Sequence, residues 1–242
     1  PAGAELSVPW SQIITGEGRR VYRPERTPAS WSSRFAVGRY GVDEIKLGGS
    51  VLRLAAVGPI EAGQRQELSG WIRQTAESVA TVYGEFPQQA AQILIVAIGK
   101  RNEPVPWAHV LRGGGVAAVF YIDETRPIGE FTEDWTATHE LSHMLLPYVS
   151  SRDRWFSEGL ASYYQNVLRA RDGRLTELQA WRKLHAGFER GKRAVNGDSL
   201  ARATREGWGA TMRVYWSGAA MMLKADTLLR ARSGGRQSLD SA

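Results

Sequence analysis

The order of hydrophobic patterns along the chain is the feature that most restricts its fold. Up to residue 122, most apolar residues form short, strand-length runs that glycine and proline separate, and one helical stretch lies among them. From Asp134 onward the apolar residues recur every three or four positions, which is the spacing of amphipathic helices. Strands followed by a run of helices are typical of the α+β class, so we expect an α+β fold.

The same patterns give approximate bounds for the elements. We expect strands at residues 33–40, 51–57, 93–98 and 116–122. We expect helices at residues 68–83, 134–146, 154–169, 176–188 and 217–231. Thr132 or Asp134 can cap the second helix, which should end near Leu146 because Pro147 disfavours helical geometry in the residue before it. The segment between the last two strands is expected to be a loop. We interpret residues 1–60 as an N-terminal β-rich segment and residues 61–242 as a second domain.

The composition limits which metal ligands, membrane segments and partners the chain can have. The chain has no cysteine, so any metal must be held by histidine, aspartate or glutamate. No apolar run approaches the roughly 18 residues that a membrane span needs, so we expect none in this chain. The net charge is +6, with basic residues gathered toward the C-terminus, among them Lys192, Arg193, Arg202 and Arg205. These residues would suit a nucleic-acid interface. Runs of charge are more often solvated helix faces, however, so we expect no nucleic-acid partner.

The two ends of the chain also carry expectations. Residues 1–10 have no basic start followed by an apolar stretch, so they are not an intact signal peptide. A chain that begins just after a cleaved signal would look like this, and we therefore expect a secreted or periplasmic protein, although the absence of cysteine suits the cytoplasm equally. Residues 238–242 resemble the start of another helix, from which we expect a truncated C-terminus. The sequence does not indicate an oligomeric state.

One short motif points to metal chemistry. Residues 139–143 read His-Glu-Leu-Ser-His within a predicted helix. Positions four apart on a helix differ by about 40° around its axis, so His139 and His143 can reach one metal ion. Glu140 points further round, beside the water that such a metal activates. Two imidazole ligands and a carboxylate base are what a zinc hydrolase requires. The alternative is a pair of packing histidines, which is the weaker interpretation because the chain has only four histidines.

A catalytic zinc normally has three protein ligands, so a third must be found. Glu158 is the best candidate, because the next histidine after His143 is His185. Glu158 opens the predicted helix at 154–169, and the residues between it and His143 suffice for a turn and a return. Gly159 beside it permits close packing of two helices. The alternative is a solvated glutamate that the helix dipole favours in a first turn.

The stretch from residue 138 to 164 resembles the gluzincin metallopeptidases, whose zinc helix is followed by a helix that opens with Trp-x-x-Glu-Gly-x-Ala-x-Tyr. It is most similar to the alanyl and glycyl aminopeptidase families and their smaller relatives. The resemblance covers about residues 110–230 and implies Zn²⁺ held by His139, His143 and Glu158, with Glu140 as general base and later proton donor. It also implies a thermolysin-like fold, with a small mixed sheet before a mostly helical half, and makes residues 61–242 a zinc peptidase domain.

Two further segments resemble those families. Residues 214–219 are similar to a Tyr-x-x-Gly-Ala segment, which implies that Tyr215 donates a hydrogen bond to the oxyanion of the reaction; without the resemblance, Tyr215 is a packing aromatic. Gly113, Gly114 and Gly115 correspond to a Gly-x-x-Glu element on an edge strand, which implies substrate binding. The acidic residue that grips a free amine in the aminopeptidases is missing here. The resemblance thus implies peptide or protein substrates and leaves open whether cleavage is at an end.

We therefore predict a zinc metallopeptidase that cleaves peptide bonds with a metal-activated water. The main alternative is a zinc-bearing peptide-binding or scaffold module without catalytic activity. The missing amine anchor favours that alternative, whereas Glu140 argues against it because a scaffold needs no general base.

Overall fold

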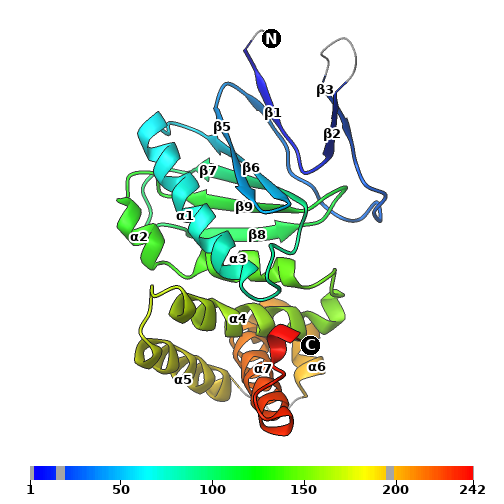
Figure 1. Cartoon of the computed structure of the whole chain (residues 1–242), viewed down its shortest axis with the longest axis vertical. Helices are drawn as coiled ribbons and strands as arrows, with labels where there is room; N and C mark the ends of the chain where they lie inside the picture. Colours follow the sequence, from blue (N-terminus) through cyan, green and yellow to red (C-terminus); the bar gives the residue numbers. More distant parts are fainter. Residues whose placement is uncertain (1–2, 15–19, 195–198, 242) are drawn as a thin grey trace. The chain divides into compact units, whose positions relative to one another are not determined.

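The computed structural model describes residues 3–14, 20–194 and 199–241. The chain forms two compact units, one from residues 1–77 and 85–140 and the other from residues 78–84 and 141–242. Strands dominate the first unit and helices the second (Figure 1), which confirms the α+β class. The division does not coincide with the boundary expected near residue 60, because strands on both sides of that residue belong to one sheet.

The first unit is built on a five-stranded mixed sheet. Its strands are β5 (Gly41–Leu47), β6 (Ser50–Val57), β7 (Ala90–Ala97), β8 (Trp107–Leu111) and β9 (Ala117–Ile122). Their order is β5-β6-β7-β9-β8, with the three central strands parallel and both edge strands antiparallel to their neighbours. Two small antiparallel pairs precede the sheet: β1 (Glu5–Ser7) with β4 (Ala36–Gly38), and β2 (Ser11–Ile14) with β3 (Arg20–Arg23).

Both faces of the sheet are covered. Helix α1 (Ala62–Ala80) crosses one face (Figure 1), where the ring of Trp71 packs edge-on against Phe120 of β9 and against Phe131 of α2 (Ile128–Glu133). On the opposite face, Ala55, Leu94 and Val119 are covered by residues of the N-terminal segment, including Ala36 and Tyr40. A sheet buried on both faces explains why its central strands are almost continuously apolar in sequence.

The helix that carries the metal motif is shorter than expected. It consists of α3 (Thr136–Ser142) and a following 3₁₀ turn, η1 (His143–Leu145). Asp134 caps it, because its carboxylate accepts a hydrogen bond from the backbone N–H of Thr136 at 2.7 Å. Thr132, the other expected cap, lies within α2. Leu146 is extended, as the residue before a proline should be.

The second unit is a helical assembly. Its main helices are α4 (Arg154–Arg171), α5 (Glu177–Arg193) and α7 (Thr211–Ser233). The turn η2 (Ser151–Asp153) precedes α4, the short helices α6 (Leu200–Ala203) and η3 (Thr204–Ala210) lie between α5 and α7, and the turn η4 (Leu239–Ser241) follows α7. Helices α4 and α7 meet at Gly159 and Gly218, where a Cβ added to Gly159 would lie 2.6 Å from the Cα of Gly218. Only glycine at both positions allows the two backbones to approach this closely.

Several sequence expectations need correction. The segment between β7 and β9, expected to be a loop, contains the edge strand β8, so His109 lies on a strand and is half-buried. Helix α7 begins at Thr211, six residues before the expected start. The helix expected from residue 238 is the single turn η4, and residue 242 lies outside the described residues. Among the residues that the structure describes, no helix is long and apolar enough to cross a membrane.

Candidate metal centre

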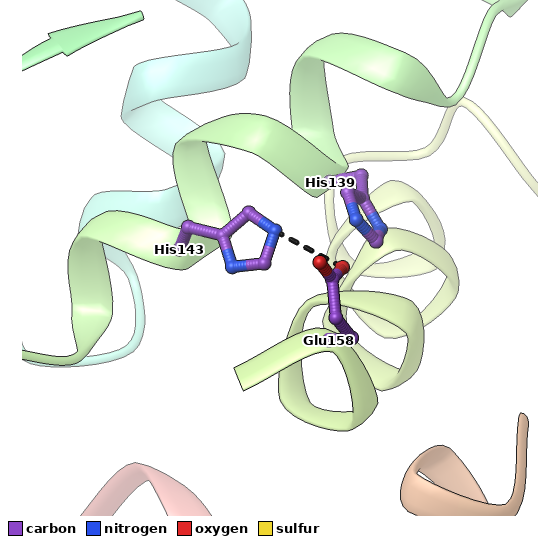
Figure 2. Close-up of side chains that lie close together, drawn as sticks. All are labelled: His139, His143 and Glu158. Carbon is purple, nitrogen blue, oxygen red and sulfur yellow. Dashed lines mark ion pairs between the residues drawn. The ribbon is translucent and has the colours of Figure 1, made fainter. Parts of the chain in front are cut away.

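The two motif histidines lie one helical turn apart. His139 is in α3, where its backbone N–H donates to the carbonyl of Trp135 at 3.1 Å, and His143 opens the 3₁₀ turn that continues α3. The His139 residue is only 2% exposed, and its ring meets the edge of the Trp135 ring with the centroids 5.4 Å apart. The sequence prediction that both imidazoles project side by side is consistent with this placement (Figure 2).

Glu158 approaches the histidines from the first turns of α4. Its Oε2 lies 3.4 Å from Nε2 of His143, and both side chains are about 15% exposed. One ligating atom each from His139, His143 and Glu158 can be chosen so that all three lie within 4.8 Å of one another. Figure 2 shows the carboxylate of Glu158 directed at the space between the two rings. The structure thus brings together the three residues that the sequence predicts as metal ligands.

The geometry of this cluster fits zinc. Two ligands of a tetrahedral zinc, each at about 2.0–2.1 Å, are separated by about 3.4 Å, which is the distance between His143 Nε2 and Glu158 Oε2. A charge-assisted hydrogen bond between the same groups would be shorter, at about 2.7–2.9 Å. Two imidazoles and one carboxylate form a donor set that zinc enzymes use. Zinc bound here would therefore be held by His139, His143 and Glu158.

The sequence prediction did not single out Ser157, which contacts His143. Its Oγ lies 2.9 Å from Nδ1 of His143, so neighbouring residues of α4 face both nitrogens of one imidazole ring. The sequence signal was available, since Ser157 directly precedes the proposed ligand Glu158. What could not be seen was which way its side chain points.

Glu140 directly follows His139 in α3 and is 8% exposed. Burying a carboxylate is costly unless it has a polar or charged neighbour. The general-base role of Glu140 stays a prediction.

Tyr215 lies on α7, one turn before Gly218, the residue at which α7 touches α4. Its ring is partly buried and packs on the same small apolar cluster as Trp155, which consists of Ala203, Ala210 and Val214. Trp155 in turn stands three residues before Glu158. The structure therefore places Tyr215 beside the N-terminal part of α4, which carries the third candidate ligand.

The glycine segment is placed differently. Gly113, Gly114 and Gly115 form the buried turn between β8 and β9. The N–H groups of Gly113 and Gly114 donate to the Ser32 carbonyl and the Thr27 hydroxyl, both at 3.0 Å. The carbonyl of Gly114 accepts from Glu25 N–H at 2.9 Å. Backbone groups of Gly113 and Gly114 are therefore hydrogen-bonded to the N-terminal segment, and the substrate-binding role of the three glycines stays a prediction.

The pKa values of His109 and Asp123, both in the first unit, are lowered. Burial, and secondarily Arg34, lower the pKa of His109, whose Nδ1 accepts a hydrogen bond from the Trp107 indole at 3.1 Å. Asp123 is fully buried just after β9. Burial alone would raise its pKa, but hydrogen bonds from Thr125 and from the backbone N–H of Arg101 outweigh it and lower the pKa of Asp123 to about 2. Asp123 is thus ionised and structural, tying the loop after β7 to that after β9.

No protein-family model matches the chain, and no curated protein matches its sequence. Solved structures do match its fold. An aminopeptidase N family protein from Idiomarina loihiensis superposes with a TM-score of 0.64 and 16% identity, over 98% of this chain and 46% of that one. An M1 zinc metallopeptidase from Deinococcus radiodurans gives 0.56 and 19%, over 96% and 51% respectively. Yeast LTA4 hydrolase, solved with bestatin, gives 0.60 and 12%, over 98% and 37%.

These identities are low, so the matches establish a shared fold. The chain spans about half the length, or less, of the structures it matches. Almost all of its own length is covered. The chain thus has the fold of part of an M1-type zinc metallopeptidase, and on that fold two histidines and a glutamate form a cluster suited to zinc.

Proposed function

We propose that this chain is a zinc-dependent peptidase that hydrolyses peptide bonds. The observation that carries the proposal is the cluster of His139, His143 and Glu158, with Glu140 next to the first ligand, on a fold shared with zinc metallopeptidases. A structural zinc site is usually closed by four protein ligands, whereas three ligands leave a position for water and substrate. The donor set therefore favours catalysis over a purely structural metal.

Zinc bound by these three residues would supply Lewis-acid chemistry, lowering the pKa of a water toward neutrality. Glu140 is assigned the proton transfers. Its carboxylate accepts a proton from the attacking water and then delivers it to the nitrogen of the departing amine. One group can perform both steps because the first leaves it protonated for the second.

Tyr215 is proposed to stabilise the oxyanion that develops on the scissile carbonyl. A phenol hydroxyl is a neutral donor that can be aimed at developing charge without paying to bury a cation. The support for this role is its position on α7 beside the first turns of α4. Replacing it with phenylalanine should lower kcat by about 10²–10³-fold, the range for loss of one oxyanion donor.

Peptides or proteins are the proposed substrates. The edge strand β8 has one side free of strand partners in the described sheet, and an extended peptide can add to such an edge by main-chain hydrogen bonds. We also propose that the likeness to gluzincins extends to a thermolysin-like arrangement of sheet, zinc helix and helical half.

The decisive experiment combines zinc analysis with a peptide-library cleavage assay on wild type, Glu140→Gln and Glu67→Gln. Wild type should hold about one zinc per chain and cleave peptides. Glu140→Gln should keep its zinc and lose at least about 100-fold in turnover, since general acid–base catalysis contributes about 10²–10⁴-fold. Glu67, which is exposed on α1, provides the control and should behave as wild type. Unchanged turnover in Glu140→Gln would refute the mechanism.

A second candidate is a zinc-bearing peptide-binding module without activity. The observation in its favour is the glycine segment, which is buried and has no carboxylate in place of the amine anchor. On this alternative, wild type would bind zinc and retain peptides on a column, yet cleave no member of the library, and Glu140→Gln would bind the same peptides equally well.

A further inference from the structure

Two consecutive residues of α4 lie beside the two ring nitrogens of His143. Nδ1 lies 2.9 Å from the Ser157 hydroxyl oxygen, and Nε2 lies 3.4 Å from the Glu158 carboxylate. The first distance is that of a hydrogen bond, and the second is that between two ligands of one zinc. The ring is therefore held at one end by a hydroxyl, while its other end faces the proposed metal position.

The chemistry of imidazole gives this arrangement a consequence. A neutral ring carries one proton, and the nitrogen that binds a metal must be the one without it. If Nε2 is the ligand, Nδ1 carries the proton and must donate it to an acceptor. The Ser157 hydroxyl has two lone pairs and lies within reach, so it can accept that hydrogen bond.

The position of Ser157 is fixed by more than its own helix. It lies two residues before Gly159, where α4 touches the backbone of α7 at Gly218. A helix held so closely at this turn cannot rotate about its axis without a backbone clash. Ser157 and Glu158 therefore move together with one rigid turn, and any shift of the serine would also shift the carboxylate.

We propose that Ser157 is a positioning residue for the metal centre: it accepts a hydrogen bond from Nδ1–H of His143 and thereby favours the tautomer whose Nε2 lone pair faces the metal position. This inference rests on the proposed function, since it concerns zinc held by His139, His143 and Glu158. It adds a residue that touches no metal and sets the affinity of the site through a ligand. Outer partners of this kind typically contribute about 10- to 100-fold to metal affinity.

The test is the zinc affinity of the metal-free protein, measured by competition with a chromophoric chelator. Ser157→Ala should bind zinc about 10- to 100-fold more weakly than wild type. Ser157→Thr keeps the hydroxyl and should return to within about threefold of wild type. Ser162→Ala is the matched control: Ser162 is on the same helix and buried, and its hydroxyl makes no hydrogen bond within the described part of the chain. Its zinc affinity should be unchanged.

The outcomes separate the two claims. If wild type and Ser157→Ala bind zinc equally well, the role of Ser157 is refuted, whereas the proposed function is not. Wild type that takes up no zinc overturns the proposed function and this inference with it. Thermal unfolding of the metal-free proteins distinguishes positioning from general damage, because general damage would lower the unfolding temperature of Ser157→Ala, whereas loss of positioning alone would leave it near that of wild type. Failure of Ser157→Thr to restore affinity, with its fold intact, would also count against the hydroxyl as acceptor.

Discussion

The candidate metal centre (His139, His143 and Glu158) and the glycine turn (Gly113, Gly114 and Gly115) are both places where segments distant in sequence come close. They differ in the groups that face each other there. At the cluster, Nε2 of His143 and the carboxylate of Glu158 face each other at 3.4 Å. At the turn, backbone groups of Gly113 and Gly114 are hydrogen-bonded directly to the N-terminal segment. Two electron-rich atoms that face each other repel unless a cation or a proton lies between them. A backbone donor and acceptor that are already hydrogen-bonded to each other need no further ligand. The comparison separates three side chains that are suited to hold a cation from a turn whose backbone groups are hydrogen-bonded within the fold.

Removing the third candidate ligand should give the largest effect. Glu158→Ala leaves two imidazoles, so zinc affinity should fall by more than the roughly 100-fold that outer partners contribute. Glu177→Ala, an exposed glutamate in the first turn of α5, is the matched control and should bind zinc as wild type does. Isothermal titration of the metal-free proteins measures both affinities. Full zinc affinity in Glu158→Ala would remove the carboxylate from the site and end the comparison with the glycine turn.

Breaking the glycine turn should cost stability and spare the metal. Gly114 has φ +71°, and an added Cβ would lie 2.7 Å from the Trp10 indole nitrogen and 2.8 Å from Pro24. Left-handed backbone costs a non-glycine residue about 1–2 kcal/mol, and overpacking costs about 1–3 kcal/mol. Gly114→Ala should therefore lower the free energy of unfolding by about 2–5 kcal/mol in denaturant titrations, with zinc affinity unchanged.

The control for this change is Gly70→Ala in the interior of α1, where an added Cβ meets nothing within 4 Å. That variant should be neutral or up to about 1 kcal/mol more stable, because alanine favours helix over glycine. If Gly114→Ala were as stable as wild type but showed an altered KM for peptides, the glycines would bind substrate after all, and the contrast with the cluster would disappear.

A substitution at the contact between α4 and α7 should lower both the stability of the fold and its affinity for zinc. Gly159→Ala forces the backbones of Gly159 and Gly218 apart, at a cost of about 1–3 kcal/mol of stability. Because Glu158 is the adjacent residue, the shift should also weaken zinc binding by a few-fold, which Gly114→Ala should not do. Chelator competition and denaturant titration on the same sample test this. Loss of stability with full zinc affinity would show that the metal cluster does not depend on this helix contact.

The sequence predicted the metal cluster well for a local reason. His139 and His143 are four residues apart on one helix, so their proximity follows from helix geometry alone. Glu158 required one further step, the reversal of the chain at Pro147, and a helix after it. The α+β class followed from the change of hydrophobic period near Asp134. In each case the information lies within about twenty residues of the site.

The features that the sequence did not predict are set by distant contacts. Strand β8 was missed because its edge position, with one row of backbone groups paired to β9, leaves no alternating pattern of apolar side chains. The hydrogen bonds of residues 25–32 to Gly113 and Gly114 could not be predicted, because nothing in the local sequence indicates that contact. Ser157 was overlooked because the direction of a hydroxyl depends on where His143 lies after the chain has turned.

The smallest effect should come from acid titration of Asp123, which tests whether the sheet unit can be weakened without touching the metal. The pKa of Asp123 is lowered from its ordinary 3.8 to about 2 in the folded protein. Between these values the unfolded chain binds the proton and the folded one does not, so the ionised carboxylate stabilises the fold above pH 4, and this contribution is lost as pH falls toward 2. Asp123→Asn cannot titrate, so its unfolding free energy should depend on pH less steeply by up to about one proton in this window. Denaturant midpoints from pH 5 to 2 measure the difference.

The zinc affinity at neutral pH should be the same in wild type and Asp123→Asn. Asp123 is hydrogen-bonded to Arg101 and Thr125, which are not part of the candidate metal centre. An equal pH dependence in wild type and variant would mean that the Asp123 carboxylate is not held by these hydrogen bonds. A parallel loss of zinc affinity would mean that the loop after β9 supports the metal centre, so that the sheet and the cluster could no longer be treated as separable parts.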